Sequence, residues 1–221
     1  MAGKLIVIEG LDGSGKATQA VRLAAALQER GLSVREISFP NYDSDSSALV
    51  KMYLAGCFGR EPGDVNAYAA SAFYAVDRYA GMKQDWGSYY DAGGILIADR
   101  YTTSNAVHQC CKLDRREWDT YLDWLAEFEY RKLGLPEPDR VFYLRLQLEE
   151  SQQLMTGRYH GNEQEKDIHE RNTAYLRKAR EAAEYCALKY SWQVIDCMYD
   201  GVLRSIEEIG EELLERFDSE T

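Results

Sequence analysis

The chain has 221 residues, of which 45% are hydrophobic and 29% are charged, a composition typical of a folded globular protein with a sizeable core. Its formal net charge of −11 argues against sequence-independent binding to nucleic-acid backbones, which needs a basic surface. A small anionic substrate held in a local basic pocket is compatible with that charge.

Short apolar runs alternate with longer amphipathic segments along the chain. The apolar runs cover residues 4–10, 32–39, 94–99, 140–146 and 192–196. The amphipathic segments, which we predict to be helical, cover 16–30, 45–56, 64–86, 102–111, 114–132, 167–190 and 202–217. Such alternation is typical of buried parallel strands joined in βαβ units. We therefore predict one α/β domain over residues 1–221, with a sheet of about five parallel strands flanked by helices.

The segment at 156–167, TGRYHGNEQEKD, is polar and contains two glycines. It follows the predicted strand at 140–146 and lies between helical patterns. It fits a solvated surface loop, and it equally fits a mobile lid that carries a cation over an anionic ligand. Composition alone leaves both interpretations open.

The five cysteines form an odd number without framework spacing, which favours free thiols in a reducing compartment. No signal-peptide pattern precedes the first predicted strand, and no apolar run approaches the roughly 18 residues of a membrane span. We therefore expect a cytoplasmic protein with no membrane segment.

A glycine-rich turn, GLDGSGK at 10–16, connects the first predicted strand to the first predicted helix. It fits the pattern G-x-x-x-x-G-K in the context that a phosphate-binding loop requires, although a glycine turn that binds nothing is the alternative. The glycines allow successive N–H groups to converge on phosphate oxygens, and the helix points its positive end at the same anion. Lys16 adds a charge for the β- and γ-phosphates. The predicted ATP-binding residues are Gly10, Leu11, Asp12, Gly13, Ser14, Gly15, Lys16, Ala17 and Thr18.

Ala17 stands where such loops usually have a serine or threonine whose hydroxyl ligates Mg²⁺. Alanine cannot do this. Either phosphates, water and a carboxylate elsewhere hold Mg²⁺, or turnover is impaired. Thr18 keeps a hydroxyl, but a shift of one residue turns a helical side chain by about 100°. We expect Thr18 to contact an α- or β-phosphate instead.

Asp99 ends the apolar run at 94–99, and Arg100 follows it directly. Ligands of open α/β sheets bind beyond the carboxyl ends of the strands, so we expect this pair to face the phosphate loop. Asp99 could hold Mg²⁺ through water or orient an acceptor phosphate, and Arg100 could bind that phosphate with two hydrogen bonds. A buried structural ion pair is the alternative.

Six motifs spread over the chain are IEGLDGSGK at 8–16, FP at 39–40, FYAVDR at 73–78, DRYTTSNAVHQ at 99–109, PDRVFYLRL at 138–146 and KDIHERNTAYL at 166–176. With these motifs nearly the whole chain resembles the thymidylate kinase family, nucleoside monophosphate kinases that move the γ-phosphoryl of ATP onto dTMP. The resemblance implies a P-loop NTPase-type doubly wound fold with a short lid. It also implies ATP and Mg²⁺ as cofactors and dTMP as the substrate.

The resemblance assigns roles around the base and sugar of dTMP. Asp12 matches a carboxylate near the sugar hydroxyl. Tyr74 and Arg78 are four residues apart and share a helix face. Tyr74 matches an aromatic residue, usually phenylalanine, that stacks on thymine, and Arg78 matches an arginine that hydrogen-bonds the base. Without the resemblance, a core aromatic beside a surface arginine would be the favoured interpretation.

The resemblance also places residues around the acceptor phosphate. Arg100 matches the arginine that binds it, and Ser104 and Asn105 match a polar pair facing the base and phosphate. His108 and Gln109 lie one turn further along and are expected on the deoxyribose side. The predicted substrate-binding residues are Asp12, Phe39, Tyr74, Arg78, Arg100, Ser104, Asn105 and Gln109.

Two basic contacts depart from the commonest family pattern. Some members place a basic residue in the phosphate loop, where this chain has Gly13, and others, mostly bacterial, supply an arginine from the lid. The resemblance makes Arg158 the candidate, with Lys166 and Arg171 as alternatives. The arginine that many members carry after FP is absent, and Lys51 is a candidate to replace it. The predicted catalytic residues are Lys16, Asp99, Arg100 and Arg158, with Asp99 also the predicted metal ligand.

Two other functions fit the sequence. One is a kinase of another nucleoside monophosphate or of a deoxynucleoside. The other is a non-catalytic nucleotide-binding regulator, which Ala17 suggests. Family members are commonly homodimers that pair through helices. The alanine- and tyrosine-rich segment at 67–82 is expected to pair in this way, with packing on its own sheet as the alternative.

Overall fold

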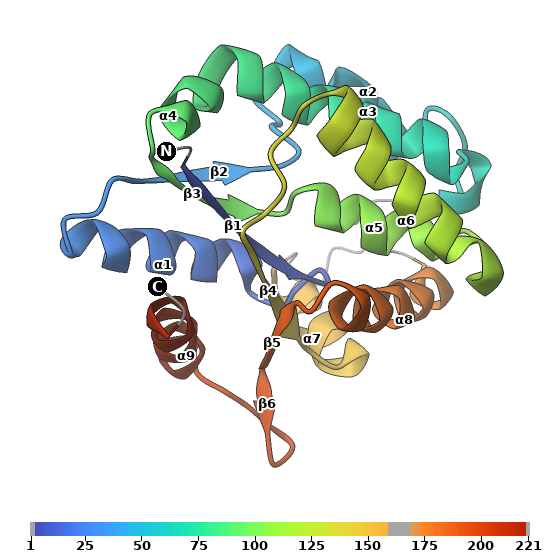
Figure 1. The fold of residues 1–221 in the computed structure, drawn as a ribbon. Helices are drawn as coiled ribbons and strands as arrows, with labels where there is room; N and C mark the ends of the chain where they lie inside the picture. The colour runs from blue at the N-terminus through green and yellow to red at the C-terminus, as the bar shows by residue number, and fades with distance from the viewer. Residues whose placement is uncertain (1–2, 159–168, 171, 220–221) are drawn as a thin grey trace.

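The central feature of the computed structural model, which describes residues 3–158, 169–170 and 172–219, is a parallel sheet (Figure 1). For residues 155–158 it describes the backbone alone. The strands are β1 (Lys4–Gly10), β2 (Val34–Ser38), β3 (Ile95–Asp99), β4 (Arg140–Arg145) and β5 (Gln193–Asp196), in the order β2-β3-β1-β4-β5. Every neighbouring pair is parallel. The predicted five-stranded α/β fold is confirmed.

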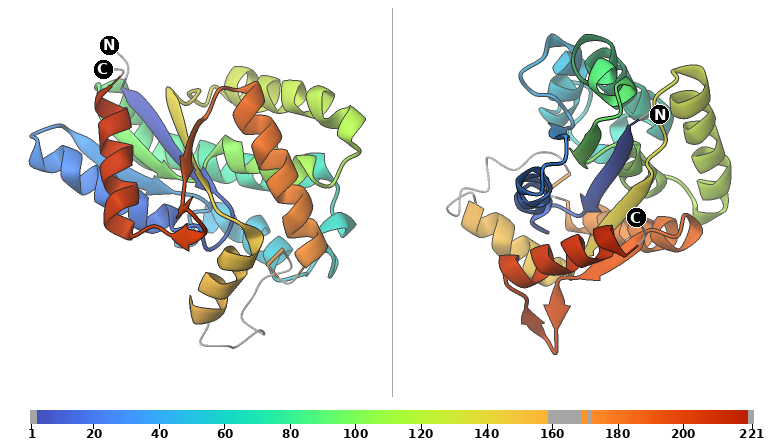
Figure 2. Two further views of the ribbon diagram at one scale, coloured as in Figure 1. Left: turned by 90° about the horizontal axis from the view of Figure 1, so that it is seen from below. Right: turned by 60° about the vertical axis from the view of Figure 1, so that its left-hand side comes forward.

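Helices cover both faces of this sheet (Figures 1 and 2). On one face lie α1 (Lys16–Glu29) and α9 (Ile206–Asp218). On the other lie α3 (Ala67–Gly81), α5 (Thr102–Cys110), α6 (Trp118–Ala126) and α8 (Thr173–Lys189). The remaining described α-helices are α2 (Ala48–Leu54), α4 (Gly87–Asp91) and α7 (Leu148–Arg158). None of the helices in the described part of the chain is long and apolar enough to cross a membrane.

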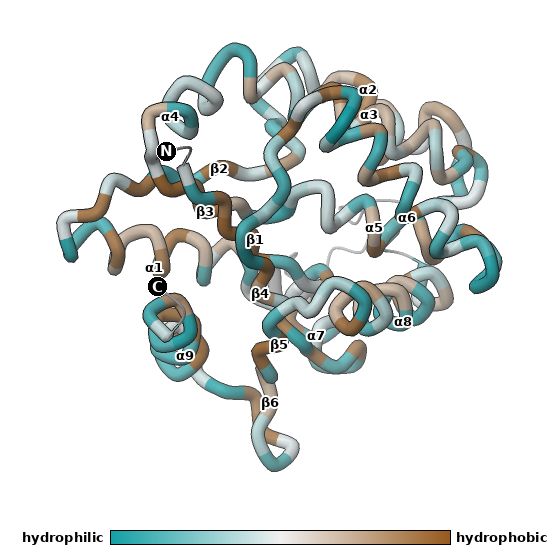
Figure 3. Tube along the Cα trace, in the orientation of Figure 1, coloured by the Kyte–Doolittle hydropathy of each residue, from teal (hydrophilic) through white to brown (hydrophobic). Residues whose placement is uncertain are grey.

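Alternate residues of β1 build the two cores on either side of the sheet. Leu5 and Val7 belong to the core under α5, α6 and α8, whereas Ile6 and Ile8 belong to the core under α1 and α9. The apolar character of the strands is visible in Figure 3. Burial of each such aliphatic side chain contributes about 1.5–3 kcal/mol. Packing on both faces therefore holds the sheet in place, and with it the carboxyl ends of the strands from which the loops begin.

Helix α6 continues as a π-helical turn, η5 (Glu127–Lys132). A similar turn, η3 (Met82–Trp86), joins α3 to α4, so the predicted helix at 64–86 begins and ends later than expected. Single π-helical turns within helices are frequent at functional sites. In η5 the turn places Glu129 inside the protein, with 0% of its surface exposed.

Two segments near the carboxyl half differ from the prediction. Residues 198–203 form a hairpin of β6 (Met198–Tyr199) and β7 (Val202–Leu203), so the last helix begins at Ile206, where Ser205 caps it. Helix α7 was not predicted, because its sequence LEESQQLMTGR has no clear apolar face. It includes the first residues of the predicted lid, Thr156–Arg158, and residues 159–167 lie outside the described part.

Candidate active site

A cavity of about 1160 Å³ opens at the carboxyl ends of β1, β2 and β3. Its walls are the phosphate loop, the residues after β2 and β3, helices α3 and α5, and the start of α9. Ligand pockets of proteins usually measure about 300–1,000 Å³, so this cavity is large enough for more than one small ligand. Its position is the one where ligands of open α/β sheets bind.

The phosphate loop connects β1 to α1 as the sequence predicts. Gly13 and Gly15 have φ angles of 81° and 85°, a left-handed conformation that favours glycine. A Cβ on Gly10 would lie 2.5 Å from Oγ of Ser14, so this position also needs glycine. Lys16 begins α1, and its Nζ donates to the carbonyl of Leu11 at 2.8 Å. Burial and the nearby Arg100 lower the pKa of Lys16.

Arg100 and Asp12 both line the cavity and form an ion pair with each other. Arg100 also donates from Nη1 to Oγ of Ser104 at 3.4 Å. Burial alone would raise the pKa of Asp12, but the charges of Arg100 and Lys16 hold it well below its usual range. The alternative of an ion pair between Asp99 and Arg100 is therefore wrong, because the arginine pairs with the phosphate loop instead.

Asp99 lines the cavity and keeps one oxygen, Oδ1, buried with no hydrogen-bond partner. Oγ of Ser14 is in the same state. Within the described residues no group of three or more His, Cys, Asp or Glu side chains could hold a metal ion. A carboxylate with a free buried oxygen fits a magnesium ion whose other ligands are phosphates and water. Ala17 also lines the cavity and adds no oxygen from its side chain.

Glu9 is a buried carboxylate beneath the phosphate loop that the sequence analysis missed. It accepts hydrogen bonds from Oγ1 of Thr103 and Oγ of Ser104, both at 2.7 Å, and from the N–H of Gly10 at 2.9 Å. It thereby joins the start of the loop to the start of α5. A charged residue at the end of the apolar run IVIEG was the signal that could have identified it.

The predicted base-binding residues Tyr74, Arg78 and Asn105 line one part of the cavity. Arg78 is only 1% exposed, so it is not a surface arginine. Its Nε and Nη2 donate to the carboxylate of Glu129 at 2.7 and 2.6 Å, and this charge raises the pKa of Arg78 against the effect of burial. Glu129 could not be identified from sequence, because acidic residues in amphipathic helices are usually solvated.

Gln109 and His108 also line the cavity. Both side-chain amide atoms of Gln109 are buried without a hydrogen-bond partner, which suits a polar ligand. Nε2 of His108 lies 3.4 Å from Nη1 of Arg100. Burial and the charge of Arg100 lower the pKa of His108 to about 3, so its ring is neutral at neutral pH.

Phe39 and Lys51 complete this end of the cavity. Phe39 packs against Tyr101 and Trp86, with ring centroids 5.9 and 6.5 Å apart. Lys51 donates from Nζ to the carbonyl of Tyr42 at 3.1 Å. A cation is therefore present near the FP motif, where the family arginine is absent.

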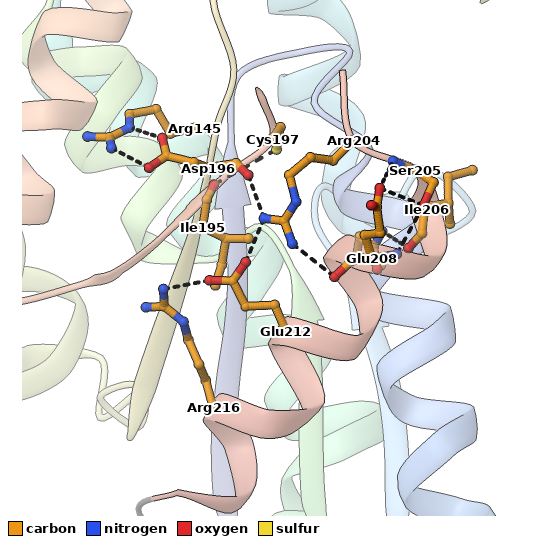
Figure 4. A network of polar contacts seen from close by, with 11 residues as sticks. Arg145, Ile195, Asp196, Cys197, Arg204, Ser205, Ile206, Glu208, Glu212 and Arg216 are labelled. Carbon is orange, nitrogen blue, oxygen red and sulfur yellow. Dashed lines mark hydrogen bonds and ion pairs between the residues drawn. The ribbon is translucent and has the colours of Figure 1, made fainter. Parts of the chain in front are cut away.

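The opposite wall is formed by the β6–β7 hairpin and the start of α9, which a polar network holds together (Figure 4). Arg204 donates from Nη1 to the carbonyl of Asp196 at 2.8 Å and to Glu212 at 2.6 Å. Its Nη2 donates to the carbonyl of Glu208 at 3.0 Å. Arg145 in turn binds the carboxylate of Asp196. These bonds fix Leu203 and Ile206 along the cavity.

The remaining predicted cations are not placed by the structure. The side chain of Arg158 and all of Lys166 and Arg171 lie outside the described residues. Gly13, by contrast, is described, and it brings no charge to the loop.

The fold and the cavity define a nucleotide-binding α/β protein of the P-loop class. The family model "Thymidylate kinase" matches residues 8–208. Thymidylate kinase of Mycobacterium tuberculosis is 32% identical over 158 residues, which cover 70% of this chain and 71% of that protein. The human thymidylate kinase is 30% identical over 146 residues, covering 66% and 62%. The chain belongs to the thymidylate kinase family.

A solved structure of thymidylate kinase from Candida albicans has the same fold, with a TM-score of 0.70. It is 21% identical in sequence, and the match covers 99% of this chain and 92% of that one. The predicted P-loop NTPase-type architecture is thereby confirmed.

Proposed function

We propose that this protein transfers the γ-phosphoryl group of ATP to dTMP and so forms dTDP. The observation that carries the proposal is the contact between Arg100 and Asp12 within one cavity. This contact joins the candidate site for the acceptor phosphate, at Arg100, to the phosphate loop, which is the candidate site for ATP. Tyr74 and Arg78, which match the family's base-binding residues, line the same cavity. Membership of the thymidylate kinase family supports the choice of dTMP.

The donor end is assigned to the phosphate loop. Backbone N–H groups of residues 10–18 would bind the phosphates of ATP, aided by the positive end of α1. Lys16 would place its charge on the β- and γ-phosphates. Asp99 would hold Mg²⁺, with phosphates and water as the other ligands, because its Oδ1 is buried and has no partner. When bound, Mg²⁺ neutralises charge that develops on the transferred group.

The acceptor end is assigned to the residues around α3 and α5. Arg100 would bind the phosphate of dTMP, and Asp12 would lie near the sugar hydroxyl. Tyr74 would stack on the thymine ring. Phe39, which lines the same cavity, would add apolar surface, and Gln109 would lie on the deoxyribose side. Ser104, which donates to Glu9 at 2.7 Å, holds the start of α5 against the loop.

Arg158 is the proposed catalytic cation. Transfer of a phosphoryl group gains most from positive charge at the migrating group. The phosphate loop contains Gly13 where some family members have a basic residue, so the charge has to come from elsewhere. The lid proposed for residues 156–167 contains Arg158 at its start.

We also propose that the protein is a cytoplasmic homodimer that pairs through α2 and α3. These helices expose large apolar side chains: Leu49, Met52, Tyr68, Val76 and Tyr79 are each 37–45% exposed. The two helices are in contact with each other, and contiguous exposed apolar surface is typical of an interface. Sedimentation should give about twice the chain mass of 25.3 kDa, and a value near 25.3 kDa would contradict the dimer.

Ligand-induced thermal stabilisation tests the substrate assignment. The true acceptor should raise the melting temperature strongly, because it binds only the folded protein. A panel of dTMP, dUMP, dCMP, dGMP, AMP and thymidine should give the largest shift with dTMP. A larger shift with another monophosphate, or with the nucleoside, would favour the related kinase activity instead.

A further inference from the structure

Glu129 is a buried carboxylate that touches two of the proposed base-binding residues. It lies in η5 and its side chain is 0% exposed. Arg78 donates to it from both Nε and Nη2. Oγ1 of Thr102 donates to it at 2.9 Å, and Nδ2 of Asn105 donates at 2.9 Å. No part of the proposed phosphoryl transfer uses this carboxylate.

These contacts fix the orientation of the Asn105 amide. Nδ2 donates to Glu129 and also to the carbonyl of Ser71 at 3.2 Å. An amide nitrogen has two hydrogens, so both are used. A flipped amide would place its oxygen against two acceptors, since an ionised carboxylate only accepts. The group that Asn105 has left for a ligand in the cavity is therefore Oδ1, an acceptor.

Arg78 supplies the opposite kind of group. Glu129 takes Nε and one hydrogen of Nη2, and Nη1 makes a long contact of 3.4 Å with the carbonyl of Tyr101. The remaining hydrogens of the guanidinium can only donate, because arginine has no acceptor. The base end of the cavity thus combines a donor from Arg78 with an acceptor from Asn105.

We propose that Glu129 is a positioning residue that fixes this donor–acceptor order and so selects the imide edge of thymine. The imide edge has a carbonyl oxygen, O4, for Arg78 and an N3–H for Oδ1 of Asn105. Cytosine has an amino group and an unprotonated N3 at the same positions, so both contacts would be mismatched. Buried polar groups left unpaired give strong discrimination. This inference rests on the proposed dTMP kinase function.

Glu129→Gln tests the proposal because it keeps the shape but gives the side chain an amide that can also donate. The Asn105 amide can then turn, and the ratio of kcat/KM for dTMP to that for dCMP should fall about 10-fold or more. The KM for dTMP should rise while kcat at saturating dTMP changes little. Glu127→Gln is the matched control in the same turn: its side chain is 54% exposed and pairs with Lys132 on the surface, so the ratio should not change.

Glu129→Gln also leaves the charge of Arg78 buried without its partner, which can unfold a protein. The conservative variant Glu129→Asp keeps a carboxylate, which carries the charge that pairs with Arg78 and can only accept from Asn105. It should fold and retain the preference for dTMP, and loss of that preference would overturn the proposal. So would a folded Glu129→Gln protein with the wild-type ratio. A wild-type protein that does not prefer dTMP would instead contradict the proposed function.

Discussion

Arg100, at the end of β3, binds the carboxylate of Asp12 in the phosphate loop, although the two residues are 88 positions apart. Arg100 has a left-handed backbone, with φ of 68°, and its N–H donates to the carbonyl of Ile8 at 3.2 Å. Left-handed conformations are uncommon for residues other than glycine and often mark functional positions. The pair therefore connects the proposed acceptor-phosphate site to the proposed donor site.

Arg100→Lys should lower kcat/KM for dTMP about 10- to 100-fold, because lysine cannot bind a phosphate with two parallel hydrogen bonds. Binding of ATP should change little. Arginine and lysine must adopt the same left-handed backbone at position 100. The difference between the two proteins therefore reports on the guanidinium group. Steady-state kinetics and an ATP titration measure both effects. A variant with lower thermal stability but wild-type kcat/KM would indicate a purely structural pair.

Ala17→Ser should lower the Mg²⁺ concentration needed for half-maximal rate, because it restores the hydroxyl ligand of the usual phosphate loop. The KM for dTMP should stay the same. Initial rates at fixed ATP and varied Mg²⁺ test this, with Ala17→Val as a control that adds bulk but no oxygen. If serine and valine behave alike, Mg²⁺ is held without any contribution from position 17. If wild type is inactive and Ala17→Ser is active, the protein is a regulator that has lost its chemistry.

Arg158→Ala should reduce kcat by about 100-fold or more while dTMP still binds, because the residue is proposed to act on the migrating phosphoryl group. Calorimetric titration with dTMP separates binding from turnover. Lys166→Ala and Arg171→Ala are the comparison variants. A larger loss of kcat in either of them than in Arg158→Ala would reassign the catalytic cation.

The folded protein should lose stability as the pH falls below about 6.5, the ordinary pKa of histidine. Burial, followed by the charge of Arg100, lowers the pKa of His108 to about 3, and burial and the neighbouring His108 lower that of His169. Below about pH 6.5 and above the lowered pKa values, the two histidines bind protons in the unfolded chain but not in the folded chain. The free energy of unfolding therefore rises with pH in this range. Each proton contributes a slope of about 1.4 kcal/mol per pH unit.

Denaturant unfolding at several values between pH 5 and pH 7 measures that slope. His108→Asn should reduce the slope by the contribution of about one proton, because the unfolded chain then has one fewer group to protonate. An unchanged slope in this variant would show that His108 is protonated in the folded protein.

The fold was predictable because its signals are local. The runs around β1 and β3 are short, apolar and β-branched, and the glycines at 13 and 15 occupy the left-handed positions that a phosphate loop needs. The β6–β7 hairpin was not predictable in the same way. Met198–Tyr199 and Val202–Leu203 are too short to show periodicity, and polar contacts of Arg204 hold them in place.

The cavity-lining residues that could be predicted lie at the carboxyl end of a strand or in a family motif. Asp99 ends β3 and Arg100 follows it. Glu9 and Glu129 escaped prediction for another reason. Each acts by accepting hydrogen bonds from residues far away in the sequence, Thr103 and Arg78 respectively. Such partners are brought together by packing, and no spacing in the sequence records them.

The most direct test of the proposed function is a coupled assay of ADP formation from ATP, with dTMP, dUMP, dCMP and dGMP as acceptors, in the presence and absence of Mg²⁺. We predict the fastest reaction with dTMP and none without Mg²⁺. Failure of dTMP to give ADP above background, while another monophosphate does, would contradict the assignment. Failure of every acceptor would contradict the kinase activity, and an ATP titration would then show whether the protein binds the nucleotide without catalysis.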